Sequence, residues 1–183
     1  MPIATVTLTR PEAGNRIDVQ ALSELSSAAD AISTNNGVSV VLLQAEGADF
    51  CRGWDDDALA PRLQPTAPVD AFGAIAALPM PVVASMQGAV SSAGLELALC
   101  ADIRIASDNA RFSLPELSQG LLPLGGGSQR LARIAGRGAA SSMLLLAEEL
   151  DAASALRCGL VSRVVPAADL SEQANVQIGR AHV

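Results

Sequence analysis

Lysine is absent from this chain of 183 residues, so all twelve basic residues are arginine. Without lysine the protein cannot form a Schiff base, a Ser–Lys dyad or the usual P-loop. Histidine occurs once, at His182, the second-last position. A Ser-His-Asp or Cys-His site, or a histidine-rich metal centre, would therefore depend on a terminus, where chains are least ordered. These absences leave the carboxylates as the main candidates for acid–base chemistry, and we expect no metal site.

Aromatic residues and positive charge are also scarce. Aromatics make up 2% of the chain, tyrosine is absent and the net charge is −7. Nucleic-acid binding usually needs a basic surface and aromatic side chains on which bases can stack. The composition therefore argues against a nucleic-acid partner.

The three cysteines, Cys51, Cys100 and Cys158, are widely spaced and odd in number. They form no CxxC pair and predict no disulfide framework, which favours a reducing compartment and buried, unpaired thiols. No secretory signal opens the chain, because charged residues precede any apolar region. We therefore expect a cytoplasmic protein.

The longest uncharged stretch, Ala71–Leu95, is long enough to span a bilayer. It contains Pro79, Pro81, three glycines and few large aliphatic residues. This composition favours a buried core segment broken by turns over a membrane helix, so we expect no membrane partner.

Hydrophobic periodicity predicts strands that alternate with helices, which indicates an α/β fold. The predicted strands are Ile3–Thr9, Val38–Leu43, Val82–Met86, Ile103–Ala106, Arg111–Ser113 and Leu160–Val165. The predicted helices are Asp18–Ser33, Val69–Ala77, Ser92–Cys100, Ser128–Ile134, Ala139–Ala147 and Ala152–Arg157. We expect one domain over residues 1–170, followed by a short tail, 171–183, that is either disordered or non-native.

Glu96 and Glu116 stand in runs of small and apolar residues. A carboxyl group with apolar neighbours tends to have a raised pKa, and two such groups can supply an acid and a base near neutral pH. Glu96 lies three residues beyond Ala93, on the same face of a helix whose first N–H groups could stabilise an oxyanion. Glu116 follows Pro115, which holds it on a rigid turn. Taken alone, either glutamate is more often a structural carboxylate than a catalytic one.

Two further motifs are weaker. Gly125–Ser128 resembles a phosphate cradle, but without a following lysine it is more typical of a flexible connection or a helix N-terminus. Asp55–Asp57 could bind a cation, although a solvated acidic loop is the simpler interpretation.

Five segments, in order along the chain, resemble the enoyl-CoA hydratase/isomerase (crotonase) family over about Ile3 to Leu170. They are LTRPEAGNRID (8–18), VVLLQAEGADFCRGWD (40–55), PVVASMQGAVSSAGLELALCADIRIAS (81–107), ARFSLPELSQGLLPLGGGSQRLARIAGRGAA (110–140) and ASALRCGLVSRVVP (153–166). The resemblance implies a crotonase-like (ClpP/crotonase) spiral of repeated ββα units with a truncated C-terminal helical region. It also implies an acyl-CoA thioester substrate, no metal or redox cofactor, and a homotrimer or dimer of trimers.

The resemblance further implies roles for individual residues. By position, the two oxyanion-hole N–H groups fall on Trp54 and Ala93, and the two glutamates of the family's hydratases fall on Glu96 and Glu116. In those hydratases the pair holds a water molecule that is added across the α,β double bond. The neighbouring positions expected to contact substrate are Cys51, Arg52, Asp55, Gly94, Gly120 and Leu124.

Several positions depart from the family pattern. Glu12 stands where relatives often have a basic residue near the CoA phosphates, Trp54 replaces a small residue, and Leu124 replaces a glycine near the water site. Ser92-Ala93-Gly94 replaces a glycine run, and the chain ends before helices that cap the acyl-CoA pocket in relatives. Both glutamates favour an enoyl-CoA hydratase. The alternatives are enoyl-CoA isomerase, thioester hydrolase, or a catalytically silent CoA-binding or oligomerising module.

Overall fold

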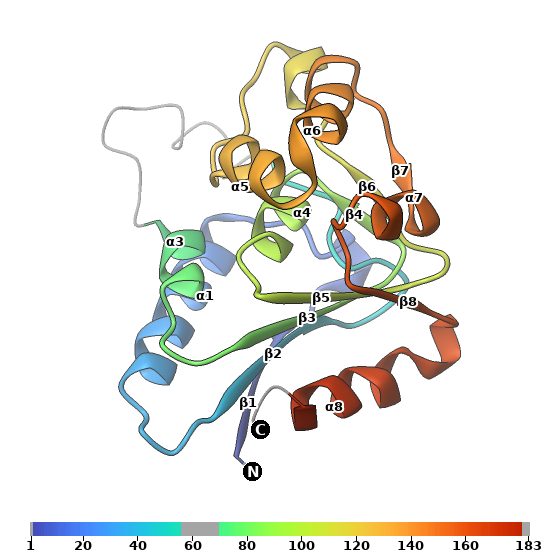
Figure 1. Cartoon of the computed structure of the whole chain (residues 1–183). Helices are drawn as coiled ribbons and strands as arrows, with labels where there is room; N and C mark the ends of the chain where they lie inside the picture. The colour runs from blue at the N-terminus through green and yellow to red at the C-terminus, as the bar shows by residue number, and fades with distance from the viewer. Residues whose placement is uncertain (1, 56–69, 181–183) are drawn as a thin grey trace.

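A five-stranded parallel sheet forms the centre of the computed structural model, which describes residues 2–55 and 70–180. The strands follow the spatial order β1-β2-β3-β5-β8 (Figure 1). Their bounds are β1 (Ile3–Leu8), β2 (Val40–Ala45), β3 (Val82–Met86), β5 (Ile103–Ser107) and β8 (Arg163–Val165). All four neighbouring pairs are parallel. Each of these strands was predicted from its aliphatic pattern, with ends shifted by a few residues at β2 and β8.

The sheet is buried on both faces, as the near-continuous apolar run in β2 predicts. Val41 and Leu43 belong to a large hydrophobic cluster on one face. Val40 and Leu42 point the other way and join a second, smaller cluster. Successive side chains of a strand alternate between faces, so a single strand contributes to two cores.

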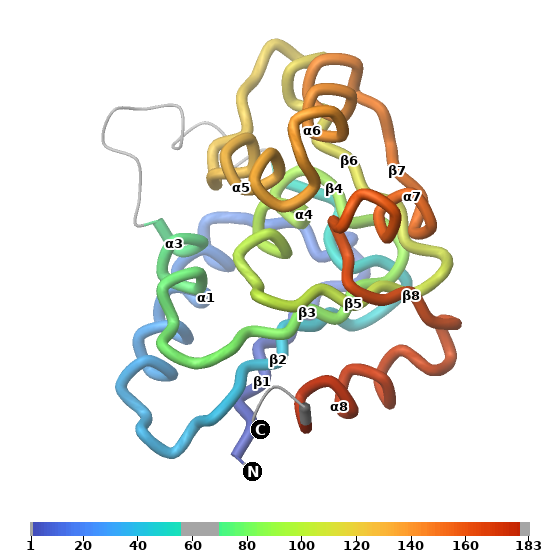
Figure 2. The backbone as a smooth tube through the Cα atoms, in the orientation of Figure 1, coloured from blue at the N-terminus to red at the C-terminus, as the bar shows by residue number. Residues whose placement is uncertain are grey.

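Helices α1 (Val19–Ser33) and α3 (Ala71–Ala76) pack on one side of the sheet (Figures 1 and 2). Asp18 caps α1 by accepting a hydrogen bond from the backbone N–H of Ala21, as expected from the sequence. Asp70 caps α3 in the same way through the N–H of Gly73. The predicted helices are present, although α3 is shorter than expected.

Helix α8 (Leu170–Arg180) covers the opposite face of the sheet (Figures 1 and 2). Leu170, Ala174 and Ile178 are buried there, in one cluster with Val83 and Ile105. The sequence predicted a domain boundary at residue 170 and a tail from residue 171. Instead, helix α8 continues the packed domain through Arg180. Its apolar residues recur at helical spacing and cover strand side chains that would otherwise face water. Residues 181–183 lie outside the described part of the chain.

A smaller sheet of three strands stands beside the main one, with β4 (Ala89–Ser91) parallel to β6 (Arg111–Ser113) and β7 (Leu150–Asp151) antiparallel to β6. The remaining helices are α4 (Ala93–Ala98), α5 (Gly127–Ile134), α6 (Gly136–Leu145) and α7 (Ala152–Arg157). Three 3-10 turns complete the described elements: η1 (Pro11–Ala13), η2 (Glu116–Gln119) and η3 (Ala167–Asp169). Strands β4 and β7 were not predicted, because the segments AVS and LD stand next to turn residues and show no strand pattern of their own.

The uncharged stretch Ala71–Leu95 is divided among α3, β3, β4 and the start of α4. This division confirms the prediction of a core segment broken by turns. Among the residues that the structure describes, no helix is long and apolar enough to cross a membrane.

Candidate active site

Three parallel segments end at one edge of the small sheet. Cys51 forms a parallel bridge with Val90 of β4, and Ser91 at the end of β4 pairs with Ser113 at the end of β6. Carboxyl ends of neighbouring parallel strands meet at the same edge, where α/β proteins commonly bind ligands. The residues that follow these ends are Trp54, Ala93 and Glu116.

The segment that carries Trp54 is held on both sides. On one side, the N–H of Cys51 donates to the carbonyl of Ala89 at 3.0 Å. On the other, the N–H of Ile17 donates to Gly53 and the N–H of Asp55 donates to Ile17, each at 2.9 Å. These bonds fix the backbone on either side of Trp54, as a preorganised N–H donor would require.

Gly94 allows the Trp54 and Ala93 segments to approach closely. A Cβ atom at position 94 would lie 2.6 Å from both the Cβ and the carbonyl oxygen of Cys51. Ala93 begins α4, so its N–H has no intrahelical acceptor. The two expected oxyanion-hole positions therefore belong to segments in direct contact.

Ser92 precedes α4 with φ 53° and ψ −124°, a backbone conformation that residues other than glycine rarely adopt. We expect Ser92→Gly to raise the free energy of unfolding by about 1 kcal/mol, since relief of strain exceeds glycine's entropic cost. Urea denaturation measures the change. Ser142→Gly, within α6, is the matched control and should instead lower stability by about 0.5 kcal/mol. Equal destabilisation by both changes would contradict the strain at Ser92.

Glu96 is fully buried in the first turn of α4. Its Oε1 accepts hydrogen bonds from the backbone N–H groups of Gly125, at 2.7 Å, and Gly127, at 2.8 Å. Gly127 begins α5, whose N-terminus carries the positive end of the helix dipole. Both interactions stabilise a carboxylate, whereas the complete burial of the side chain opposes its charge.

The glycine run 125–127 is therefore a cradle for a side chain of the protein itself. A Cβ at Gly127 would lie 2.9 Å from both Cγ and Oε1 of Glu96, and one at Gly125 would lie 2.3 Å from the ring of Phe72. The run forms the N-terminus of helix α5, which was one of the two simpler interpretations of its sequence, the other being a flexible connection. Its role as a binding partner of Glu96 was missed, although a glycine cluster before a helix is a known anion-binding signal.

Glu116 begins η2, directly after Pro115, and is 3% exposed. Neither of its carboxylate oxygens has a hydrogen-bond partner among the described residues. Buried polar atoms without partners are uncommon and call for an explanation such as catalysis or a bound water. The backbone of Glu116 is held in the turn, because its carbonyl accepts a hydrogen bond from the N–H of Leu121 at 2.9 Å.

Trp54 and Phe72 form an aromatic wall next to Glu96. Their rings stack with centroids 5.4 Å apart and planes inclined by 20°. Phe72 in turn packs against Gly125, whose N–H binds Glu96. The structure thus brings Trp54 and Glu96 to the same region. Phe72 was not singled out in the sequence, because a lone aromatic in a short apolar helix gives no functional signal.

The other expected substrate-contact residues differ in exposure. Cys51 is fully buried beneath Gly94, and burial raises the pKa of its thiol to about 12, so the side chain is an inert part of the core. Arg52 is exposed and pairs with Asp49 at 2.6 Å. Gly120 ends η2 with φ 73°, and Leu124 lines a cavity beside the cradle. Asp55 is part of the ladder with Ile17, while positions 56 and 57 of the acidic run lie outside the described residues.

Two of the three free cysteines, Cys51 and Cys100, are buried and Cys158 is half-buried. Within residues 2–55 and 70–180, no three His, Cys, Asp or Glu side chains gather as metal ligands would.

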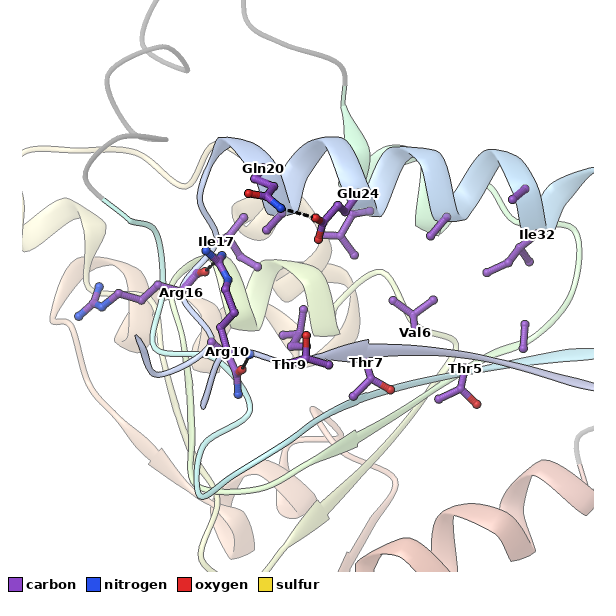
Figure 3. Close-up of a pocket in the computed structure, with 17 residues that line it drawn as sticks. Thr5, Val6, Thr7, Thr9, Arg10, Arg16, Ile17, Gln20, Glu24 and Ile32 are labelled. Carbon is purple, nitrogen blue, oxygen red and sulfur yellow. Dashed lines mark hydrogen bonds between the residues drawn. The ribbon is translucent and has the colours of Figure 1, made fainter. Parts of the chain in front are cut away.

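A separate cavity of about 580 Å³ lies between α1 and β1 (Figure 3). Its lining includes neither Glu96 nor Glu116. Its charged side chains already have partners within the protein. Arg10 pairs with Asp18, Arg16 donates to the carbonyl of Trp54, and Glu24 accepts from Gln20. The two glutamates and the glycine cradle are therefore the stronger candidate for chemistry.

The parallel sheet with α8 on one face, and a small sheet that ends at two buried glutamates, define an α/β protein with the crotonase fold. Residues 1–180 match the family model described as enoyl-CoA hydratase/isomerase, and the chain belongs to that family.

Named relatives agree with this assignment. The chain is 38% identical to a probable enoyl-CoA hydratase of Mycobacterium bovis, over 94% of this chain and 68% of that protein. It is 35% identical to the 2,3-dehydroadipyl-CoA hydratase of Escherichia coli, over 96% and 70% of the two chains. A crystal structure of an enoyl-CoA hydratase from Mycobacterium avium superposes with a TM-score of 0.85 at 38% identity, covering 97% of this chain and 75% of that one.

Proposed function

We propose that this protein is an enoyl-CoA hydratase, which adds water across the α,β double bond of a 2-enoyl-CoA thioester. The observation that carries the proposal is the pair of buried glutamates, of which Glu96 is bound by two backbone N–H groups and Glu116 has no partner among the described residues. Similarity to relatives named as hydratases supports the same reaction class.

In the proposed mechanism the thioester oxygen accepts hydrogen bonds from the backbone N–H groups of Trp54 and Ala93. Developing negative charge on that oxygen is stabilised by these donors and by the N-terminus of α4. Glu96, held as a carboxylate by the cradle, takes a proton from water as it attacks the β-carbon. Glu116 gives a proton to the α-carbon. The proton that Glu96 took from water then passes through solvent to Glu116, so that both groups return to their starting states. Every proton is carried by a glutamate, so no metal or redox cofactor is needed.

The test is to incubate purified protein with a short-chain 2-enoyl-CoA and to follow loss of the conjugated thioester absorbance. We expect a 3-hydroxyacyl-CoA product, with a rate that EDTA leaves unchanged. A 3-enoyl-CoA and a saturated acyl-CoA, assayed in parallel, distinguish the alternatives. Formation of 2-enoyl-CoA from the first would indicate an isomerase, and release of free CoA from the second would indicate a hydrolase. CoA binding without turnover of any of them would support a silent module.

We also propose that the chain assembles as a homotrimer or a dimer of trimers. Leu122, Leu145 and Leu146 are large apolar side chains with 67%, 70% and 69% exposure, and they project from the loop before α5 and the end of α6. Exposed apolar groups of this size often mark subunit contacts. Light scattering coupled to gel filtration tests the assembly, and a monomer at micromolar concentration would contradict it.

A further inference from the structure

A second cavity, of about 410 Å³, adjoins the turn that holds Glu96. One wall is formed by Leu124, Gly125 and Gly126, the residues of that turn. The opposite lining comes from helix α5 and from the cap of α3. Its polar members are Asp70, Gln129, Arg130 and Arg133.

Two arginines and one aspartate line the cavity, so its lining carries a net positive charge. In the part of the chain that the structure describes, the ion pairs are Arg10–Asp18 and Arg52–Asp49, and neither involves Arg130 or Arg133. Asp70, the one acidic group of the lining, already accepts the N–H of Gly73 as a helix cap. Neither guanidinium group is paired with a carboxylate in the described residues, although the chain carries a net charge of −7. Arginine is the side chain best suited to bind a carboxylate or a phosphate.

Arg130 is fixed next to the catalytic cradle. Its Nη1 donates to the carbonyl of Gly125 at 2.5 Å, while the N–H of the same residue binds Glu96 at 2.7 Å. From backbone dimensions, the guanidinium and the Glu96 carboxylate are at most about 9 Å apart. Arg133 is exposed, forms no ion pair with a described residue and lies about one helical turn further along α5.

We propose that this cavity binds the terminal carboxylate of the acyl chain, with Arg133 and Arg130 as its partners. The substrate class would then be CoA monothioesters of short unsaturated dicarboxylic acids. This inference rests on the proposed hydratase function. Gly125 connects the two places, because its N–H binds Glu96 and its carbonyl accepts from Arg130 in the cavity lining. The phosphates of CoA are the other possible anion, but a long pantetheine arm separates them from the thioester. A carboxylate a few carbons beyond the double bond can span the distance of at most about 9 Å between Glu96 and the Arg130 guanidinium.

The experiment compares two 2-enoyl-CoA substrates of equal chain length, one ending in a methyl group and one in a carboxylate. The wild-type protein should favour the carboxylated substrate in kcat/KM. Arg133→Gln should lower that preference by about tenfold, the usual effect of losing one charge-assisted hydrogen bond. Arg137→Gln is the matched control, since Arg137 is also exposed but lines a different cavity, and it should keep the preference.

Calorimetry with the corresponding saturated acyl-CoA and carboxyacyl-CoA gives a readout independent of turnover. A preference in binding that Arg133→Gln removes supports the site, even if no hydration occurs and the proposed function fails. An unchanged preference in that variant would overturn the inference. Equal weakening of both ligands and of CoA itself would assign the arginines to a CoA phosphate, and would likewise overturn it.

Discussion

Replacing Glu116 with glutamine is expected to lower kcat/KM for 2-enoyl-CoA hydration by roughly a thousandfold, a typical effect of losing one acid–base group. The side chain is buried, and neither oxygen is bonded to a described residue. Glutamine keeps the shape but cannot exchange a proton with the α-carbon. Because no contact of the fold is lost, the melting temperature should stay the same or rise. Stopped-flow or steady-state absorbance at the enoyl thioester band, with thermal unfolding, measures both.

Glu96→Gln should have a similar effect on kcat/KM for a different reason. An amide oxygen can still accept the N–H groups of Gly125 and Gly127, so the cradle stays formed while the charge is lost. Without a carboxylate, the water is no longer activated. Near-normal hydration in both variants would rule out the two-carboxylate mechanism, and loss of activity in only one would favour an isomerase-type reaction.

Gly127→Ala is expected to lower kcat by about a hundredfold, because moving a reacting group by about 1 Å can cost that much in rate. The added methyl group would stand 2.9 Å from Cγ and Oε1 of Glu96, closer than real Cβ contacts. Glu96 is fully buried, so it cannot move aside without changing its position over the substrate. Activity within a few-fold of wild type would show that the cradle is not needed for the reaction.

Gly138→Ala is the control for this change. Gly138 lies in α6, and a Cβ there would meet nothing within 4 Å. Alanine should therefore leave kcat unchanged and raise stability by about 0.5–1 kcal/mol through helix propensity. The comparison separates the effect of contact with Glu96 from the general effect of a methyl group in a helix.

The strands of the main sheet and most helices could be read from the sequence, because burial on two faces leaves long aliphatic runs and amphipathic helices leave a regular period. The sequence did not predict β4, β7 or α8. The first two lack the aliphatic pattern that marks the strands of the main sheet. Leu170, Ala174 and Ile178 form an apolar stripe, but only the tertiary structure shows that this stripe covers the sheet face opposite α1 and α3.

The candidate site divides in the same way. The residue types exclude lysine chemistry and leave Glu96 and Glu116 as candidates, whereas their joint role is what the family resemblance implies. The stacking of Trp54 on Phe72 and the contact between Gly94 and Cys51 do not. These contacts join segments far apart in the chain, which local patterns cannot register.

The sequence by itself therefore determined which side chains are available for chemistry, since composition alone removed most alternatives to carboxylates. Only the tertiary structure decided which groups surround them. Apolar neighbours along the chain suggested a carboxyl group without polar partners, but Glu96 accepts hydrogen bonds from the N–H groups of Gly125 and Gly127, which are 29 and 31 residues away in the sequence. The charge of a buried group depends on its neighbours in space, and the fold sets those neighbours.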